Sequence, residues 1–136
     1  ISPDNKVINK SKKFSDRIIF KGEVSDKMLK EYYSQADIFV FPSIYEGFGL
    51  PPLEAMASGV PVTASKTASI PEVCGDAVLY FDAYNTYDIA EKILLLANDD
   101  NLKKGYIAKG FKQVKRYSWT KTSEKTIKVI DKLIRN

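Results

Sequence analysis

The sequence predicts an α/β fold in which a parallel sheet is flanked by helices. Three short apolar runs, within residues 36–42, 60–64 and 78–81, alternate with segments whose apolar residues recur at helical spacing. Near-continuous apolar runs are typical of strands buried on both faces, as in a parallel sheet. Strands that alternate with helices favour parallel pairing through right-handed crossovers. A doubly wound domain usually has about five or six strands, so we expect the amino-terminal part of the domain to be absent.

The first part of the chain is expected to contain an irregular entry, a short strand and a helix. Residues 1–16 are polar, and residues 17–20 form a short apolar run that stops before Gly22. Ser25 and Asp26 are typical of a helix N-cap. Apolar and aromatic residues then follow at helical spacing, and we expect the two tyrosines among them to be buried: Met28, Leu29, Tyr32 and Tyr33.

Residues 43–52 follow the apolar run at 36–42 and predict a loop that leads into a helix. They contain two glycines and two prolines. The prolines favour the helix start, because the first turn does not use the N–H group that proline lacks. Residues 53–57 are strong helix formers, and Gly59 is placed to end the helix as its C′ residue. The strand over 60–64 should carry its proline near its start.

A short helical turn over 69–73 and the strand over 78–81 are expected next. Asn85 or Thr86 is placed to cap a helix that runs over residues 87–97. The apolar residues expected on the buried side of that helix are Ile89, Ile93, Leu94 and Leu96.

Two further helices complete the expected fold. Asp99 or Asp100 should open the first, which runs to about residue 116, and Ser118 should cap the second. Trp119 is expected to anchor the core at the start of the last helix. An apolar stripe along that helix should lie against a further domain or against the sheet of this chain: Ile127, Ile130, Leu133 and Ile134.

The composition excludes several classes of chemistry. There is no histidine, which removes the commonest general base and every histidine-dependent triad. Cys74 is the single cysteine, so neither a disulfide framework nor a cysteine-based metal site can form. We expect Cys74 to be a buried small apolar residue. Ile1 in place of a methionine suggests a fragment, and no signal peptide or membrane-spanning run is visible.

The net charge of +4 is interpreted as a solvated basic surface. The lysines do not form one dense block with interleaved aromatic residues, so nucleic-acid binding is not expected. Peripheral contact with an anionic membrane surface is a remaining alternative.

The segment from Phe41 to Val62 carries the chemistry. A buried strand, a glycine-rich loop and a helix start follow one another, and in open α/β sheets ligands bind beyond the carboxyl ends of strands. A helix amino terminus offers unpaired N–H groups to phosphate. Gly47 and Gly49 allow the backbone to approach a ligand closely. The segment therefore predicts an anion site.

Two carboxylates accompany this predicted anion site. Glu46 lies in the loop, and Glu54 lies in the first turn of the helix, eight positions later. Ionised carboxylates accept hydrogen bonds from sugar hydroxyls, which points to a sugar phosphate or a nucleotide. The alternative is that Glu54 only favours the helix dipole, that Glu46 is solvated and that the glycines serve turns.

Residues 45–62 (YEGFGLPPLEAMASGVPV) resemble the signature of family 4 glycosyltransferases with the GT-B fold. In that signature two glutamates are separated by seven residues, as Glu46 and Glu54 are here. Further segments resemble the family in the same order, so that the resemblance covers about residues 17–120: residues 20–24, 36–43, 69–73 and 117–119.

The resemblance implies that residues 1–136 are a single, partial carboxy-terminal domain of Rossmann-like fold, whose amino-terminal acceptor domain is absent. The implied enzyme is a retaining hexosyltransferase of polysaccharide biosynthesis, with a nucleotide-diphosphate sugar as co-substrate. It needs neither a metal nor another cofactor. Its acceptor is a lipid-linked sugar, a surface polysaccharide or a protein, and its expected location is cytoplasmic, at the inner face of the membrane.

The resemblance also assigns roles to individual residues. Glu46 is the implied catalytic residue and contacts hydroxyls of the donor sugar near the reacting carbon. The loop around Gly47 binds the sugar and the diphosphate through the backbone amides of Phe48, Gly49 and Leu50. Glu54 binds the ribose hydroxyls, and the turn formed by Val24, Ser25 and Asp26 lies near the base.

One part of the family pattern is missing. The family usually supplies an arginine and a lysine to the diphosphate from an earlier βα unit, and no matching segment precedes Phe20. We therefore expect weak nucleotide binding and no transfer by this chain alone. The alternatives are a non-catalytic nucleotide-sugar-binding module and a basic module for nucleic acid or anionic membranes.

Overall fold

The computed structural model describes residues 9–14 and 17–135, and the chain divides into two compact units, Ile1–Tyr32 and Tyr33–Asn136. The described part of the first unit contains the 3₁₀ helix η1 (Lys12–Phe14) and most of α2 (Asp26–Gln35). The Oγ of Ser25 accepts a hydrogen bond from the N–H of Met28 at 3.4 Å, which confirms the predicted helix start. Whether residues 1–136 form a single domain stays a prediction.

The predicted strand over residues 17–20 is wrong. The N–H groups of Arg17 and Ile18 both donate to the carbonyl of Phe14, so this segment continues the turn of η1. Ile19 is 71% exposed. A strand forms only where a neighbouring strand exchanges backbone hydrogen bonds with it, and an apolar sequence by itself does not supply that neighbour.

The second unit contains the parallel sheet that the sequence predicts. Among the described residues the sheet has three strands, β1 (Phe39–Phe41), β2 (Val62–Ser65) and β3 (Leu79–Phe81), in the order β1-β2-β3. Val40 is opposite Thr63, and Thr63 is opposite Leu79. Every residue of the central strand β2 is buried, as expected for a strand covered on both faces.

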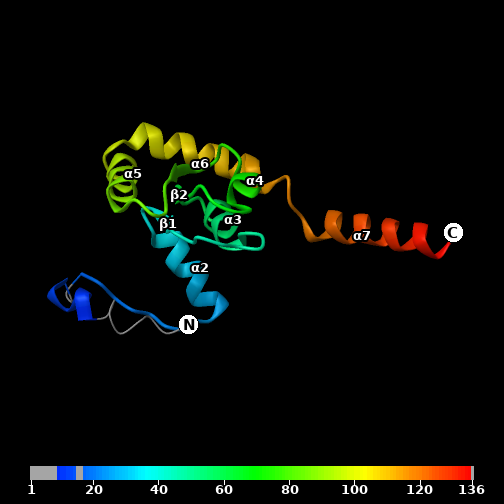
Figure 1. The fold of residues 1–136 in the computed structure, drawn as a ribbon, viewed down its shortest axis with the longest axis horizontal. Helices are drawn as coiled ribbons and strands as arrows, with labels where there is room; N and C mark the ends of the chain where they lie inside the picture. The colour runs from blue at the N-terminus through cyan, green and yellow to red at the C-terminus, as the bar shows by residue number, and fades with distance from the viewer. Residues whose placement is uncertain (1–8, 15–16, 136) are drawn as a thin grey trace. The chain divides into compact units, whose positions relative to one another are not determined.

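Among the described residues, five helices come after β1 in the chain, and they pack around the strands or follow them (Figure 1). They are α3 (Leu50–Ala57), α4 (Ile70–Cys74), α5 (Thr86–Asn98), α6 (Asp100–Val114) and α7 (Trp119–Ile134). Helix α3 packs against β1, β2 and α6, and α5 packs against β3 and α6. Cys74 is buried, as predicted, in a core that also includes Met56, Ile70, Phe81 and Leu96.

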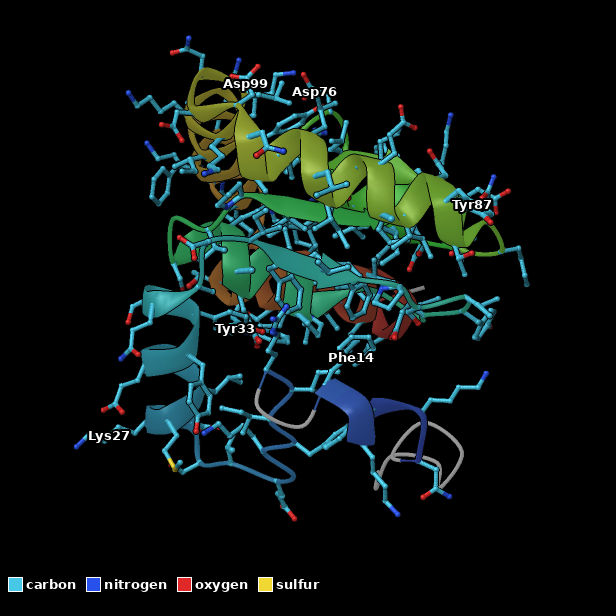
Figure 2. All side chains as sticks on the ribbon, turned by 90° about the vertical axis from the view of Figure 1, so that its left-hand side faces the viewer. Phe14, Lys27, Tyr33, Asp76, Tyr87 and Asp99 are labelled. Atoms are coloured by element: carbon cyan, nitrogen blue, oxygen red, sulfur yellow. The ribbon has the colours of Figure 1, made fainter. Side chains whose placement is uncertain are left out.

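The predicted helix caps are confirmed, and the open alternatives are resolved. Asn85 caps α5 by accepting from the N–H groups of Tyr87 and Asp88. Asp99, labelled in Figure 2, caps α6. Ser118 caps α7 by accepting from the N–H of Lys121 at 3.1 Å. A side-chain oxygen at each N-cap satisfies N–H groups that the first turn leaves unpaired.

Two burial predictions in the carboxy-terminal helices are wrong, and one of the two alternatives for the stripe of α7 is excluded. Leu94 is 59% exposed, so it does not belong to the buried side of α5 that the spacing of apolar residues predicts. Trp119 is 79% exposed and does not anchor the core. No residue of α7 is buried, so its apolar stripe does not pack on the sheet of this chain.

The contact between α3 and α6 depends on a glycine. A Cβ at Gly110 would lie 3.1 Å from Cγ and 3.2 Å from Cβ of Met56, which is buried in α3. We predict that Gly110→Ala lowers the free energy of unfolding by about 1–3 kcal/mol through overpacking, although alanine favours a helix. Urea denaturation followed by circular dichroism measures this change.

Gly105→Ala is the matched control in the same helix, because nothing lies within 4 Å of its added Cβ. Gly105→Ala should raise the free energy of unfolding by about 0.5–1 kcal/mol. A stabilising effect of both substitutions would contradict the close packing of α6 on α3.

Candidate functional site

The loop between β1 and α3 is shaped by Gly49. This residue is the N-cap of α3 and has φ +102°, a backbone conformation that favours glycine. It is buried, and a Cβ added to it would lie only 2.7 Å from Cδ1 of Ile70 at the start of α4. Gly47 is different, because an added Cβ there meets nothing within 4 Å. The loop therefore packs closely against α4 at Gly49, whereas the side of Gly47 where a Cβ would lie faces open space.

The start of α3 offers peptide N–H groups without a competing side chain. No side chain caps the helix, and proline occupies its first positions. Pro51 and Pro52 have no N–H group, so the donors of this terminus come from the residues around them, such as Gly49 and Leu50. A terminus with unpaired N–H groups suits an anion.

The side chain of Glu46 is half-buried and is held by a neighbouring hydroxyl. The Oγ of Ser43 donates to Oε1 of Glu46 at 2.8 Å. The Oγ of Ser69 lies 2.9 Å from the backbone carbonyl oxygens of both Glu46 and Phe48 and can donate its one hydrogen to either. Neither serine was predicted as a site residue from the sequence, although both lie shortly after the carboxyl end of a strand, where ligands bind in such sheets.

Glu54 is also held by a hydroxyl group. The OH of Tyr33 (Figure 2), in the last turn of α2, donates to Oε2 of Glu54 at 3.2 Å. Burial, together with the charge of Glu54 and this hydrogen bond, raises the pKa of Tyr33 to about 12. The sequence predicts a buried Tyr33 but gives no signal for its partner, which is 21 positions away.

The structure brings most of the predicted site residues together on one loop and helix. Glu46, Gly47, Phe48 and Gly49 are consecutive in the loop, and Leu50 and Glu54 lie in α3. The prediction that Glu54 lies in the first turn is wrong, because the helix begins at Leu50 and its first turn contains no acidic residue. The predicted base-binding residues, Val24, Ser25 and Asp26, belong to the first compact unit, so their role stays a prediction.

Two hollows are lined by residues of the second unit. One of about 390 Å³ has a largely apolar lining that includes Phe48, Leu53, Tyr117 and Trp119. The rings of Phe48 and Tyr117 meet edge to face, with centroids 5.7 Å apart. The other hollow, of about 340 Å³, follows β2 and β3, and its lining includes Lys66, Asp82 and Asp88.

The acidic residues of the second hollow already have partners within the chain. Asp88 accepts from the N–H of Asp82 and pairs with Lys92, and Asp82 accepts from the N–H of Tyr84. In the part of the chain that the structure describes, no group of three or more His, Cys, Asp or Glu side chains is placed to hold a metal ion. The expectation that no metal is needed stays a prediction.

We predict that Gly49→Ala destabilises the protein and displaces the loop. A side chain at positive φ costs about 1–2 kcal/mol, and the contact with Ile70 adds to this cost. Thermal unfolding measures the loss of stability. Gly47→Ala is the control and should change the midpoint little, because its Cβ points into open space. Equal destabilisation by the two variants would contradict the described loop.

The contact between Tyr33 and Glu54 predicts a pH dependence of stability. Folding raises the pKa of Tyr33 from its ordinary value of 10.0 to about 12, so the native state binds this proton more tightly. The resulting stabilisation is complete below pH 10 and is lost as pH rises from about 10 to about 12. Urea denaturation of Tyr33→Phe across this range should show a shallower decline than the unaltered chain. Tyr87→Phe, which alters an exposed tyrosine, is the control and should keep the original slope.

The sequence matches a known family and several curated proteins. The profile of the family described as "Glycosyl transferases group 1" matches residues 5–113. The chain is 44% identical over 110 residues to O-antigen chain mannosyltransferase B of Escherichia coli, a match that covers 81% of this chain and 29% of that protein. It is 33% identical over 120 residues to serotype-specific mannosyltransferase WbdA of Escherichia coli, covering 88% of this chain and 15% of that protein.

Solved structures show the same fold. Sucrose-phosphate synthase from Thermosynechococcus elongatus superimposes with a TM-score of 0.85 at 25% identity, covering 96% of this chain and 34% of that one. The C-terminal domain of a glycosyl transferase group 1 family protein (LpcC) from Francisella tularensis gives a TM-score of 0.71 at 32% identity, covering 82% and 60%. The chain thus spans less than a third of the length of the curated relatives named above, and it belongs to the group 1 glycosyl transferases, with the α/β fold of GT-B enzymes.

Proposed function

We propose that this chain supplies the donor-binding side of a retaining glycosyltransferase that moves a hexosyl group from a nucleotide-diphosphate sugar to an acceptor. The observation that supports this role most directly is the loop before α3. There, a glycine-shaped backbone, an uncapped helix start and two hydroxyl-held carboxylates lie within nine residues, from Glu46 to Glu54.

Each part of this loop has a task in the proposed reaction. The amides of Phe48, Gly49 and Leu50, with the adjacent Gly47, bind the sugar and the diphosphate. They stabilise the charge that grows on the diphosphate as it leaves, and donors fixed in advance are effective because they need no reorganisation. Glu46 accepts hydrogen bonds from the donor sugar beside the reacting carbon. Glu54 accepts from the ribose hydroxyls, and Val24, Ser25 and Asp26 lie near the base.

No metal takes part in the proposed mechanism. The leaving diphosphate is stabilised by the helix start and by basic side chains from a segment that this chain does not include. The chain alone is therefore proposed to bind nucleotides weakly and not to catalyse transfer. Zero histidines in the sequence fit a scheme that uses carboxylates and peptide groups.

The named relatives guide the choice of substrates. Both curated relatives are named mannosyltransferases, and one is named for O-antigen chains. We therefore propose a mannosyl nucleotide as the donor and a surface polysaccharide as the acceptor. A further domain of the complete protein is proposed to bind the acceptor and to cover the apolar stripe of α7, whose residue Leu133 is 73% exposed.

The location of the reaction is also a proposal. No helix in the described part of the chain has the length and apolarity needed to cross a bilayer. Cytoplasmic synthesis at the inner face of the membrane, with the basic surface of this chain near anionic lipids, fits the net charge of +4.

An amide-resolved NMR titration of this chain tests the donor site. UDP, GDP and ADP and their mannose conjugates are added in turn, because NMR detects millimolar binding. For one nucleotide, we expect signals of Gly47, Phe48, Gly49 and Leu50 to shift, together with those of residues 24–26. Glu54→Gln should weaken that binding, and Glu91→Gln, which removes an exposed carboxylate on α5, should not.

The same carboxylate chemistry is tested in the full-length protein. Glu46→Ala should lower transfer at least about 100-fold, the loss typical of removing one electrostatic contact in an active site. Full transfer by Glu46→Ala would contradict the catalytic role and would favour a non-catalytic binding module. Binding that falls steeply with salt and ignores both glutamates would instead indicate a basic module for polyanions.

A further inference from the structure

Four hydroxyl side chains join the segments that follow β1 and β2. They are Ser43 after β1, and Ser65, Thr67 and Ser69 at and after the end of β2. The Oγ of Ser65 donates to the carbonyl of Ser43, and Oγ1 of Thr67 donates to the same carbonyl at 3.0 Å. The hydroxyls of Ser65 and Thr67 lie 3.0 Å apart. The backbone at Ser43 is therefore fixed by two hydroxyls from the neighbouring strand end.

Ser43, whose backbone is fixed in this way, also holds the carboxylate of Glu46 through its own hydroxyl. Its Oγ lies 2.8 Å from Oε1 of Glu46 and 3.2 Å from the carbonyl of Tyr45. A serine hydroxyl has one hydrogen, so it donates to one of these acceptors at a time. A hydrogen bond to an ionised acceptor is the stronger choice, and the shorter distance is the one to the carboxylate.

Ser69 holds the backbone on both sides of Gly47 through its hydroxyl. Its Oγ is 2.9 Å from the carbonyl of Glu46 and 2.9 Å from that of Phe48. The turn that returns Ser69 to this loop passes through Ala68, which has φ +47°. A Cβ added at Gly47 would meet nothing within 4 Å, so no neighbouring group packs on that side of the residue.

The loop would have few restraints without these hydroxyls. Tyr45 is 82% exposed, whereas Phe48 is partly exposed and its ring meets that of Tyr117 edge to face at the helix end of the loop. The buried contact at Gly49 fixes only the helix end of the loop. The position of the carboxylate before Gly47 depends on Ser43 and Ser69.

We propose that Ser43 and Ser69 are positioning residues for sugar transfer: Ser43 orients the carboxylate of Glu46, and Ser69 fixes the peptide groups that flank Gly47. This inference rests on the function proposed above for Glu46. Neither serine touches the reacting atoms. A hydroxyl that orients a catalytic carboxylate affects the chemical step, and a hydroxyl that shapes the donor-binding backbone affects binding as well.

Steady-state kinetics of the full-length protein with UDP-, GDP- and ADP-mannose test both roles. Ser43→Ala should lower kcat by about 10–100-fold, as expected for a lost hydrogen bond to a charged group, with the donor KM unchanged. Ser69→Ala should raise the donor KM and also lower kcat. Ser43→Thr keeps a hydroxyl at the same position and should restore most of kcat.

Ser58→Ala is the matched control, since Ser58 also donates through its Oγ to a carbonyl, at 2.9 Å, but at the exposed far end of α3. It should leave both constants unchanged. Thermal unfolding of every variant separates a change in kinetics from a loss of folded protein. A fall in kcat that matches the loss of folded protein, or that Ser43→Thr does not reverse, would overturn the positioning role of Ser43.

A second measurement needs no donor and is made on this chain. Backbone order parameters from ¹⁵N relaxation at Gly47 and Phe48 should fall in Ser69→Ala, from about 0.85 toward about 0.6, because the loop loses its anchor. Unchanged order parameters would overturn the role of Ser69. If Glu46→Ala abolishes transfer but Ser43→Ala has normal kcat, the inference about Ser43 fails and the proposed function stands. If Glu46→Ala retains full transfer, the proposed function itself fails.

Discussion

The contact between Gly49 and Ile70 determines where the candidate site lies. Ile70 is fully buried and begins α4, and the lack of a side chain at Gly49 lets the loop after β1 approach it. Helix α4 is in turn fixed by α6 and the residues after it, since Gln113 and Tyr117 both donate to the carbonyl of Val73. The position of the loop thus depends on a helix that contains none of the predicted site residues.

The polar groups of the site are arranged at the border of an apolar core. Ser65 is fully buried at the end of the central strand, and its hydroxyl is satisfied by the carbonyl of Ser43. Among the described residues, no buried side-chain nitrogen or oxygen lacks a hydrogen-bond partner. Buried polar groups are tolerated when they are paired in this way, and paired groups make a rigid arrangement. The carboxylates of Glu46 and Glu54 are each attached to this rigid border by one hydroxyl.

Much of the second unit could be predicted from the sequence, because its signals are local. The parallel strands, the caps of α5, α6 and α7 and the glycine at the start of α3 follow from residue type and spacing. Long-range contacts decided the rest. Residues 17–20 have a strand-like composition, but the N–H groups of Arg17 and Ile18 donate to the carbonyl of Phe14 in η1. Trp119 is exposed because no described element covers α7. The site shows the same division: its loop was predictable, and the partners of its carboxylates were not.

Pro51 and Pro52 influence which groups of the loop could change during evolution. They remove two N–H groups from the helix start, so any anion bound there is held mainly by peptide groups of the glycine-containing segment before the helix. Peptide groups are present whatever the side chain, provided that the backbone keeps its course. The backbone here is set by Gly49 and by hydroxyls that lie outside the loop tip. Under the function proposed above, side chains at exposed positions such as Tyr45 can change during divergence while the peptide groups proposed to bind the phosphate keep their course.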